Sequence, residues 1–325
     1  RVAIIFDECH RSQFGRMNTA IKKRFKNYCM FGFTGTPIFD ENSAGGPGTT
    51  TVEVFGDCLH SYTVVDAIRD KNVLPFHLEY TNTSPTFACL EESAYADEIA
   101  AERAATPDAK ELAKFAKTKA VLESPERIEA IATYILDNYD RKTNQKERGY
   151  ELKKSRTINK VTEHYVERVR GFNSLFATAS IRAAREYYSE FKRQQEGLPV
   201  DQRLTVGIIY SCAPNADAPG GLLGEESVDP TRLSADDRAF LDAAIGDYNR
   251  TFATSCSTDA QGFENYYEDI SERLTKKAID LVIVVNMFLT GFDSKTLNTL
   301  WVDKPLRTHG LIQAFSRTNR ILNSV

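Results

Sequence analysis

Short apolar runs alternate with amphipathic segments in both halves of the chain, and a longer polar stretch separates the halves. An apolar run of about four to eight residues, rich in β-branched side chains, is typical of a strand buried in a parallel sheet. Such runs predict strands at residues 2–6, 28–34, 174–177, 205–210, 281–285 and 299–302. Apolar positions at every third or fourth residue predict helices at 17–25, 64–70, 181–194, 234–249, 262–277 and 309–320.

This alternation predicts an α/β protein with two parallel-sheet lobes. We expect the first lobe in residues 1–83, closed by an extended run at 74–80, and the second lobe in residues 161–325. The polar residues 84–160 predict a mainly helical connector. Within it, Ser124-Pro125-Glu126 places a capping hydroxyl, a proline and an acid in the order that opens a helix.

The composition is that of an ordinary globular protein. The 325 residues are 42% hydrophobic and 26% charged, and the chain is long enough for two cores. No apolar run approaches the roughly 18 residues of a membrane span, so we expect no membrane. The six cysteines lie far apart without a CxxC pair, which indicates a reducing, cytoplasmic location. Because the chain opens directly on a strand, we expect a piece of a longer protein.

The net charge of −4 hides a strong asymmetry along the chain. Residues 91–111 hold seven acids and two bases, whereas residues 141–170 hold ten bases and four acids. A basic stretch of this kind can line a path for nucleic-acid phosphates. A solvated helix face has a similar composition, and the stretch alone does not decide between the two.

Two acids, Asp7 and Glu8, directly follow the first predicted strand. In open parallel sheets, ligands bind at the carboxyl ends of strands, where both side chains would stand. In nucleotide hydrolases an acid at this position holds Mg²⁺, and a neighbouring acid positions the attacking water. Asp7 is therefore a candidate for the metal and Glu8 for the water, and the two acids by themselves equally fit a strand followed by a solvated polar turn.

Thr34-Gly35-Thr36-Pro37 follows the second predicted strand of the same lobe. Proline biases the preceding residue away from helix, so the strand ends in a fixed loop. The two threonine hydroxyls can link a hydrolysis site to a moving part through hydrogen bonds that change with nucleotide state. A common turn without a special role is the alternative.

Two further motifs lie in the second lobe. The segment LTGFD at 289–293 follows a predicted strand; Gly291 permits a phosphate or ribose to approach the backbone, and Asp293 can accept from a hydroxyl. Arg317 and Arg320 stand three apart on the last predicted helix, hence on one face. Two guanidinium groups aimed across a cleft can neutralise the charge on a transferring phosphate. The alternative is a pair of surface arginines.

In this order, the four motifs resemble those of superfamily 2 helicase-type motors. Their residues are most similar to the motifs of the motor (R) subunit of type I restriction enzymes. The segments that carry the resemblance are FDECHRS at 6–12, FGFTGTPI at 31–38, LTGFD at 289–293 and QAFSRTNR at 313–320, with GFNSLFA at 171–177 and the helix 183–191. Ser316 stands where many related motors carry glycine, a departure that the type I branch shares.

The resemblance implies two RecA-like lobes, the first incomplete, and a site that takes ATP and Mg²⁺. It implies catalytic roles for a set of charged residues, Asp7 (with Mg²⁺), Glu8, Arg317 and Arg320. Contacts with the nucleotide would come from His10, Gly291, Asp293 and Gln313. Contacts that couple hydrolysis to DNA would come from Thr34, Gly35, Thr36, Asn173 and Thr290.

The resemblance also implies a function, that of an ATP-dependent double-stranded DNA translocase in the endonuclease subunit of a type I restriction-modification complex. Its partners would be double-stranded DNA and the methyltransferase (M) and specificity (S) subunits, and a nuclease domain outside this segment would cut the DNA. The phosphate loop GxxxxGK[ST] does not occur in residues 1–325 and in the family lies upstream, so we expect these residues alone to be inactive. A strand-separating helicase of DNA or RNA and an ATP-gated DNA-binding module are the alternatives.

Overall fold

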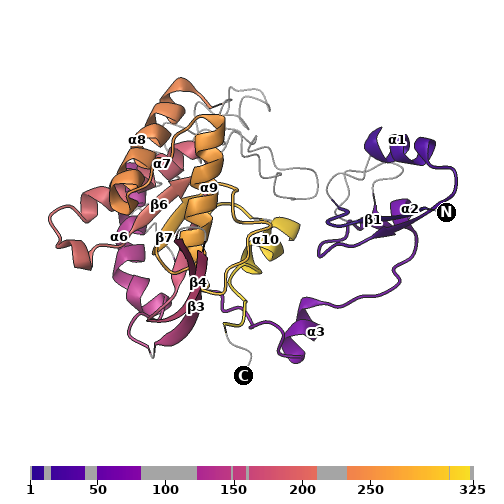
Figure 1. The fold of residues 1–325 in the computed structure, drawn as a ribbon, viewed down its shortest axis with the longest axis horizontal. Helices are drawn as coiled ribbons and strands as arrows, with labels where there is room; N and C mark the ends of the chain where they lie inside the picture. The colour runs from indigo at the N-terminus through magenta and orange to yellow at the C-terminus, as the bar shows by residue number, and fades with distance from the viewer. Residues whose placement is uncertain are drawn as a thin grey trace, which may run out of the picture.

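A computed structural model describes residues 2–10, 16–40, 50–81, 123–147, 149–158, 161–210, 233–306 and 308–322. They form a mixed α/β structure with parallel strands and helices, which confirms the predicted fold class. Figure 1 shows a small N-terminal unit around β1 and β2 and a larger C-terminal unit. Much of the predicted connector, including the acidic stretch at 91–111, lies outside the described residues. None of the described helices is both long and apolar enough to cross a membrane.

The N-terminal unit is built on a pair of parallel strands. Its elements are β1 (Val2–Phe6), α1 (Arg16–Arg24), β2 (Tyr28–Gly32), α2 (Thr51–Phe55) and α3 (Val64–Arg69). Both strands lie where the apolar pattern predicts them, but the prediction that they are buried is wrong: Ile5 is 68% exposed and Phe31 41%. The reason is that little of the described chain packs on the pair, apart from Phe55, whose ring centroid lies 5.7 Å from that of Phe6.

The C-terminal unit is built around a four-stranded parallel sheet. In order across the sheet, its strands are β6 (Val206–Ile209), β7 (Leu281–Val284), β5 (Asn173–Thr178) and β8 (Leu297–Asp303). Every residue of β5 and β7 is buried, in agreement with the apolar runs that predict these strands. The predicted strands of the second half are therefore confirmed, and their carboxyl ends share one edge of the sheet.

Helices pack around this sheet (Figure 1). The described ones are α6 (Pro125–Lys142), α7 (Ile181–Gln194), the 3-10 turn η2 (Val200–Gln202), α8 (Ala235–Phe252), α9 (Ala260–Thr275) and α10 (Thr308–Phe315). Ser124 caps α6 by accepting from Arg127 N, and Pro125 opens the helix, as predicted. Ser234 caps α8 in the same way. Side chains from α6, α7, α8 and α9 form one hydrophobic core with the strands.

The helix α6 belongs to this core and not to a separate connector. Its residues Ile131, Ile135 and Tyr139 are buried in the same hydrophobic cluster as Leu175 of β5. An amphipathic helix needs an apolar surface to cover its stripe, and here that surface is the C-terminal unit. Part of the predicted connector, residues 84–160, therefore packs within the C-terminal unit.

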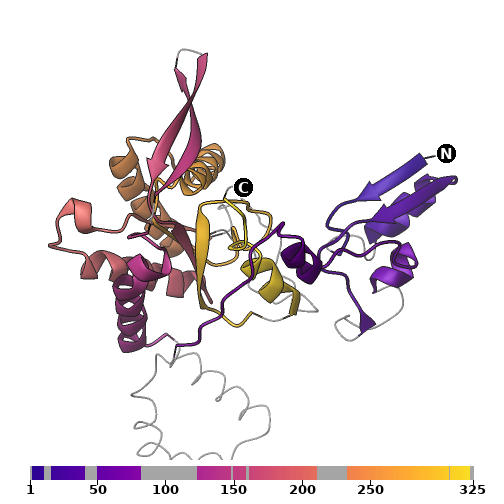
Figure 2. The same cartoon turned by 90° about the horizontal axis from the view of Figure 1, so that it is seen from below.

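Residues 150–169 form an antiparallel hairpin of β3 (Tyr150–Ile158) and β4 (Val161–Val169), where the sequence predicts mainly helix up to residue 160. The predicted boundary between residues 160 and 161 therefore falls inside the hairpin. Figure 2 shows its two strands standing out from the C-terminal unit. Nearly all the described β4 side chains are exposed, so no buried face produces the alternation that would mark strands.

Residues 74–81, which we call the strap, run from the N-terminal unit onto the C-terminal unit. Leu74 N donates to Asn319 O at 2.7 Å, next to the end of α10. Farther along the strap, Glu79 forms an ion pair with Lys142 of α6. The run that the sequence predicts to close the first lobe therefore lies on the second.

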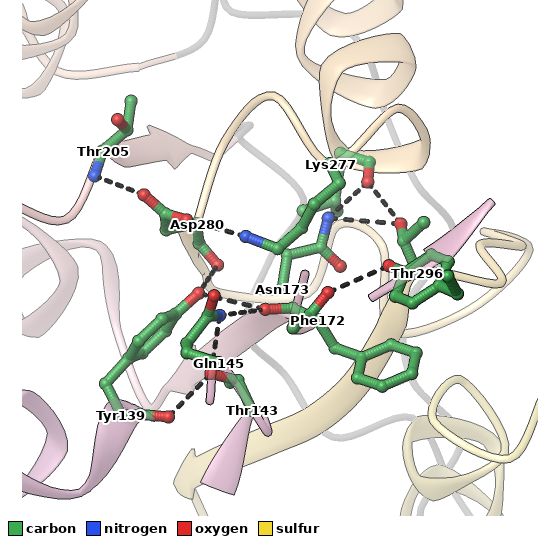
Figure 3. A network of polar contacts seen from close by, with 12 residues as sticks. Tyr139, Thr143, Gln145, Phe172, Asn173, Thr205, Lys277, Asp280 and Thr296 are labelled. Atoms are coloured by element: carbon green, nitrogen blue, oxygen red, sulfur yellow. Dashed lines mark hydrogen bonds and ion pairs between the residues drawn. The ribbon is translucent and has the colours of Figure 1, made fainter. Parts of the chain in front are cut away.

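A polar network ties the root of the hairpin to the sheet (Figure 3). Gln145 Nε2 donates to Phe172 O at 2.8 Å and to Thr143 Oγ1 at 2.9 Å. Gly171 has a φ of 62°, and a Cβ at this residue would lie 2.3 Å from Gln145 Oε1. The backbone conformation and the lack of space both favour glycine between the hairpin and the network.

Candidate active site at the junction of the two units

The acid motif forms a tight turn at the carboxyl end of β1. Asp7 and Glu8 are both exposed there, at the place where parallel sheets bind ligands. Glu8 has a left-handed backbone conformation with a φ of 47°, and its N–H donates to Asp7 Oδ1 at 2.9 Å. The turn then directs Cys9 and His10 inward, where each is 1% exposed or less. Two carboxylates thus face solvent on a turn that two buried residues anchor.

A glycine in β2 makes room for this anchor. A Cβ at Gly32 would lie 2.7 Å from Cys9 Sγ, so the turn packs directly on the β2 backbone. Cys9 N also donates to Phe33 O at 3.0 Å. Burial is the main cause that raises the pKa of the Cys9 thiol, so the thiol stays protonated at neutral pH and packs as a small apolar group.

His10 joins the acid turn to the threonine motif. Its Nδ1 lies 2.7 Å from Thr34 Oγ1 and 3.3 Å from Glu8 Oε2. Thr34 Oγ1 also accepts from Thr36 N at 3.0 Å, which fixes the turn around Gly35. A movement of Glu8 can therefore reach both threonines through one buried imidazole.

Gln313 of α10 connects this group to the C-terminal unit. Its Nε2 donates to Thr36 Oγ1 at 3.2 Å and lies 3.4 Å from His10 Nε2. Residues nearly as far apart in the sequence as the chain allows therefore meet at one point. We call the contact of Gln313 with His10 and Thr36 the junction.

The two arginines lie beyond the end of α10, and the prediction that they share a helix face is wrong. The helix ends at Phe315, and beyond it Arg317 N and Thr318 N donate to the carbonyls three residues back, in place of the helical bonds to the fourth residue back. The Ser316 and Thr318 hydroxyls also donate to carbonyls of the last turn. Arg317 donates from Nε to Gln313 O at 3.1 Å and from its terminal nitrogen to Phe292 O. It therefore holds the glycine motif against the helix that supplies Gln313.

Arg320 contacts the same glycine motif by a different route. Its Nε lies 2.8 Å from Asp293 Oδ1, and the Asp293 side chain is 64% exposed. Gly291 has a φ of 73°, and a Cβ there would meet no atom within 4 Å, so conformation and not crowding favours glycine. Thr290 is 2% exposed, and its hydroxyl makes no hydrogen bond within the part of the chain described.

Asn173 makes its contacts inside the C-terminal unit and none at the junction. It is fully buried at the first position of β5, and its amide donates to Leu274 O and to Thr296 Oγ1. The junction, in contrast, lies near the carboxyl ends of the strands. In this structure Asn173 supports the interior of the C-terminal unit.

Sequence reasoning missed two contributors to the site. The first is the carbonyl of Phe292, which accepts from Arg317 and lies in the motif that was selected for Gly291 and Asp293. Because every residue has a backbone carbonyl, the sequence does not indicate which one will accept a hydrogen bond. The strap residue Leu74 bonds to Asn319, in the segment that carries both arginines. An extended apolar run gives no signal of the surface on which it will lie.

The acid turn fits a cation that arrives with a nucleotide. Mg²⁺ is commonly bound by one or two carboxylates, with phosphates and water as its other ligands. Asp7 and Glu8 offer such carboxylates at an exposed strand end. Among the described residues, no group of three or more His, Cys, Asp or Glu side chains could hold a metal by itself. The residues therefore suit a shared site better than a cage made by protein alone.

Two protein families match separate parts of this chain. Residues 170–325 match the family described as type I restriction enzyme subunit R domain 3, and residues 1–112 match the SWI2/SNF2 ATPase family. Over 325 residues, 99% of this chain, the sequence is 39% identical to the type I restriction enzyme SauMRSORF196P endonuclease subunit of Staphylococcus aureus (strain MRSA252). Over nearly its whole length, the chain is similar to type I restriction enzyme endonuclease subunits. The resemblance drawn from the four motifs is thereby confirmed.

Other relatives carry similar names. The chain is 39% identical over 323 residues to the SsaAORF53P endonuclease subunit of Staphylococcus saprophyticus, with 99% of the chain and 29% of the relative covered. It is 26% identical over 326 residues to the putative MjaIXP endonuclease subunit of Methanocaldococcus jannaschii, with 98% and 24% covered. The chain spans only 29% of the length of its Staphylococcus aureus relative. The chain therefore aligns with only part of these endonuclease subunits, and within it residues 1–112 match an ATPase family.

Proposed function

We propose that this chain is part of the motor of an ATP-dependent double-stranded DNA translocase, which moves DNA in a type I restriction-modification complex. The single observation that supports this best is the junction, where Gln313 of one unit contacts His10 and Thr36 of the other. A motor of two lobes needs a contact between them that senses the acid turn. The junction supplies that contact.

At the acid turn, Asp7 would hold Mg²⁺ and Glu8 would orient the attacking water. The bound Mg²⁺ would supply neutralisation of charge on the phosphate oxygens. His10 lies 3.3 Å from Glu8 and 2.7 Å from Thr34, so it holds the acid and the threonine motif in one arrangement. A rearrangement at Glu8 would then shift His10 and Thr36, the residues that Gln313 contacts.

The arginines would stabilise charge on the transferring phosphate. Arg320 already pairs with an exposed carboxylate, Asp293, so exchange of this anion for a phosphate requires no new burial of charge. Arg317 is held by Phe292 O and Gln313 O. Its position therefore depends on the same helix end that makes the junction.

The remaining partners follow from the chemistry of translocation. Movement along a duplex requires grip on phosphates and not on bases, so recognition of a sequence belongs to another subunit. We propose double-stranded DNA, the methyltransferase (M) subunit and the specificity (S) subunit as partners, ATP and Mg²⁺ as cofactors, and a cytoplasmic location. DNA cleavage would belong to a nuclease domain outside residues 1–325.

The test is triplex displacement by the full-length protein assembled with M and S subunits. Displacement that requires ATP and leaves the duplex unseparated is the expected result. Separation of a short duplex would favour the strand-separating helicase instead. DNA binding that depends on ATP without displacement would favour the ATP-gated binding module.

A variant at the junction sharpens this test. Gln313→Ala removes the contacts with Thr36 and His10 and should uncouple displacement from ATP hydrolysis. Gln261→Ala is the matched control, since Gln261 lies exposed on α9 and, among the described residues, its side chain donates only to Asn265. Displacement by Gln313→Ala at the unmodified rate would show that the junction does not carry the coupling.

A further inference from the structure

The hairpin of β3 and β4 presents two different faces. Directly opposite residues of an antiparallel pair share a face, and side chains alternate along each strand. On one face, the Lys154 side chain is 8% exposed and its Nζ lies 2.9 Å from Glu167 of the facing strand. Tyr150 belongs to the same face. The cation on this face is thus neutralised by a neighbouring acid.

The opposite face, which we call the basic face, carries Lys153, Arg168 and Arg170, all exposed. A Cβ at Gly149 would lie 3.3 Å from both Arg168 Nε and Arg170 Cγ, so the two arginines lie side by side over a residue without a side chain. Lys153 is paired with Val166, two residues before Arg168, so Lys153 is a diagonal cross-strand neighbour of Arg168. The acid of this face is Glu151, opposite Arg168.

These three cations outnumber the acid of their face, Glu151. None of them forms an ion pair with an acid in the portion of the chain that the structure describes, whereas Lys154 and the basic residues of α7 do. The whole chain carries a net charge of −4, so the basic face is a local exception. Clustered, exposed and unpaired cations are the electrostatic footprint of a polyanion site.

The root of the hairpin fixes the direction of the basic face. The ring of Tyr150 stacks on Phe172 with centroids 5.1 Å apart, and its hydroxyl donates to Gly171 O at 2.9 Å. Burial raises the pKa of Tyr150 to about 12, so the hydroxyl keeps its proton. Lys276 donates to Ser155 O at 3.0 Å, and in the network of Figure 3 Gln145 donates to Phe172 O. The ribbon therefore stands out at a set angle (Figure 2).

We propose that the basic face binds phosphate groups of duplex DNA without regard to sequence, as a contact separate from the four motifs. This inference rests on the proposed function. A two-stranded ribbon fits a major groove about 12 Å wide, and cations along its face would then reach phosphates of the groove wall. An acidic protein surface is the other polyanion that could seat here, and the experiment distinguishes it.

The experiment measures how binding of non-specific duplex DNA by the full-length protein falls with salt. Each phosphate contact contributes about 0.9 to the slope of log affinity against log salt concentration. In the triple variant Lys153→Ala, Arg168→Ala and Arg170→Ala, we expect the slope to fall in magnitude by about 2.7, for three lost contacts. The double variant Arg168→Lys and Arg170→Lys keeps both charges and should keep the slope.

The matched control removes the same charge elsewhere. Lys192, Arg193 and Arg250 are exposed, and each forms an ion pair on α7 or α8. Their replacement by alanine should leave the slope unchanged. Thermal unfolding of every variant checks that the fold is intact.

Several results would overturn the proposal. An unchanged slope in a folded basic-face variant would do so. An equal reduction of the slope in the basic-face and control triple variants would also do so, because it would show that only the net charge of the protein affects DNA binding. Loss of assembly with M and S subunits at unchanged DNA binding would assign the face to protein. Absence of salt-dependent binding in the unmodified protein would instead contradict the proposed function itself.

Discussion

Replacing Gly171 with alanine should destabilise the C-terminal unit by about 3 kcal/mol. A left-handed conformation costs alanine about 1 kcal/mol. A Cβ 2.3 Å from Gln145 Oε1 would also displace that side chain. Gln145 would then lose its hydrogen bonds to Phe172 O and Thr143 Oγ1, each worth about 1 kcal/mol.

Two comparisons separate these contributions. Gly197 has a φ of 87°, and a Cβ at this residue would meet no atom within 4 Å, so Gly197→Ala should cost only the backbone contribution of about 1 kcal/mol. Gln145→Ala should cost about 2 kcal/mol. The double variant with Gly171→Ala should cost about 3 kcal/mol and not the sum of about 5, because the displaced side chain is already gone.

Urea unfolding followed by fluorescence measures these differences. Trp301 is the single tryptophan of the chain and lies partly buried in β8, so its emission reports on the C-terminal sheet. The free energies of unfolding come from linear extrapolation. Equal losses for Gly171→Ala and Gly197→Ala, or additive losses in the double variant, would refute the clash with Gln145.

Three further outcomes test the assignments around the junction. In the full-length protein, Glu8→Gln should abolish ATP hydrolysis and leave ATP binding largely intact, because it removes a charge but keeps size; phosphate release at the unmodified rate would mean that another group positions the water. Arg320→Lys should leave DNA binding near normal and slow triplex displacement by about 10³-fold or more, because an ammonium group cannot reproduce the planar fork of arginine; undiminished displacement would make Arg320 a surface cation. Residues 1–325 alone should release no phosphate above background, since they lack a GxxxxGK[ST] loop, and DNA-stimulated release near the full-length level would contradict this.

The parts of the fold that were predictable are those where burial dictates residue type. β5 and β7 are buried along their whole length, so apolar runs mark both. The start of α6 was also predictable. The Ser124 hydroxyl accepts a hydrogen bond from a backbone N–H of the first turn, and the proline that follows suits the first helical position. Local chemistry and continuous burial leave a signal that a single sequence carries.

The hairpin and the end of α10 left weaker signals. A ribbon that is exposed along β4 satisfies its backbone by cross-strand bonds and places few demands on its side chains. The helical spacing of Arg317 and Arg320 continues past the end of α10, where backbone bonds to the third residue back replace the helical ones. In both places backbone hydrogen bonding, and not hydrophobic pattern, decided the structure.

The candidate site was predictable as a set of motifs but not as an arrangement. Order along the chain placed acids and threonines at strand ends, and the structure joins them through His10. That Gln313 would meet Thr36, or that Asn173 would be buried against Leu274 and Thr296, depends on how the chain packs. Tertiary contacts of this kind leave no local pattern.

The strap has a consequence for the strength of the contacts that Gln313 makes. Two long hydrogen bonds between separate molecules would give negligible affinity. Because the strap is continuous with the N-terminal unit and bonded to Asn319, the partners stay neighbours, and short tethers typically give effective concentrations in the millimolar range. A contact this weak can then be occupied for much of the time and still be broken quickly. Lengthening the strap would lower the effective concentration of Gln313 around His10 and Thr36 without changing any of these three residues.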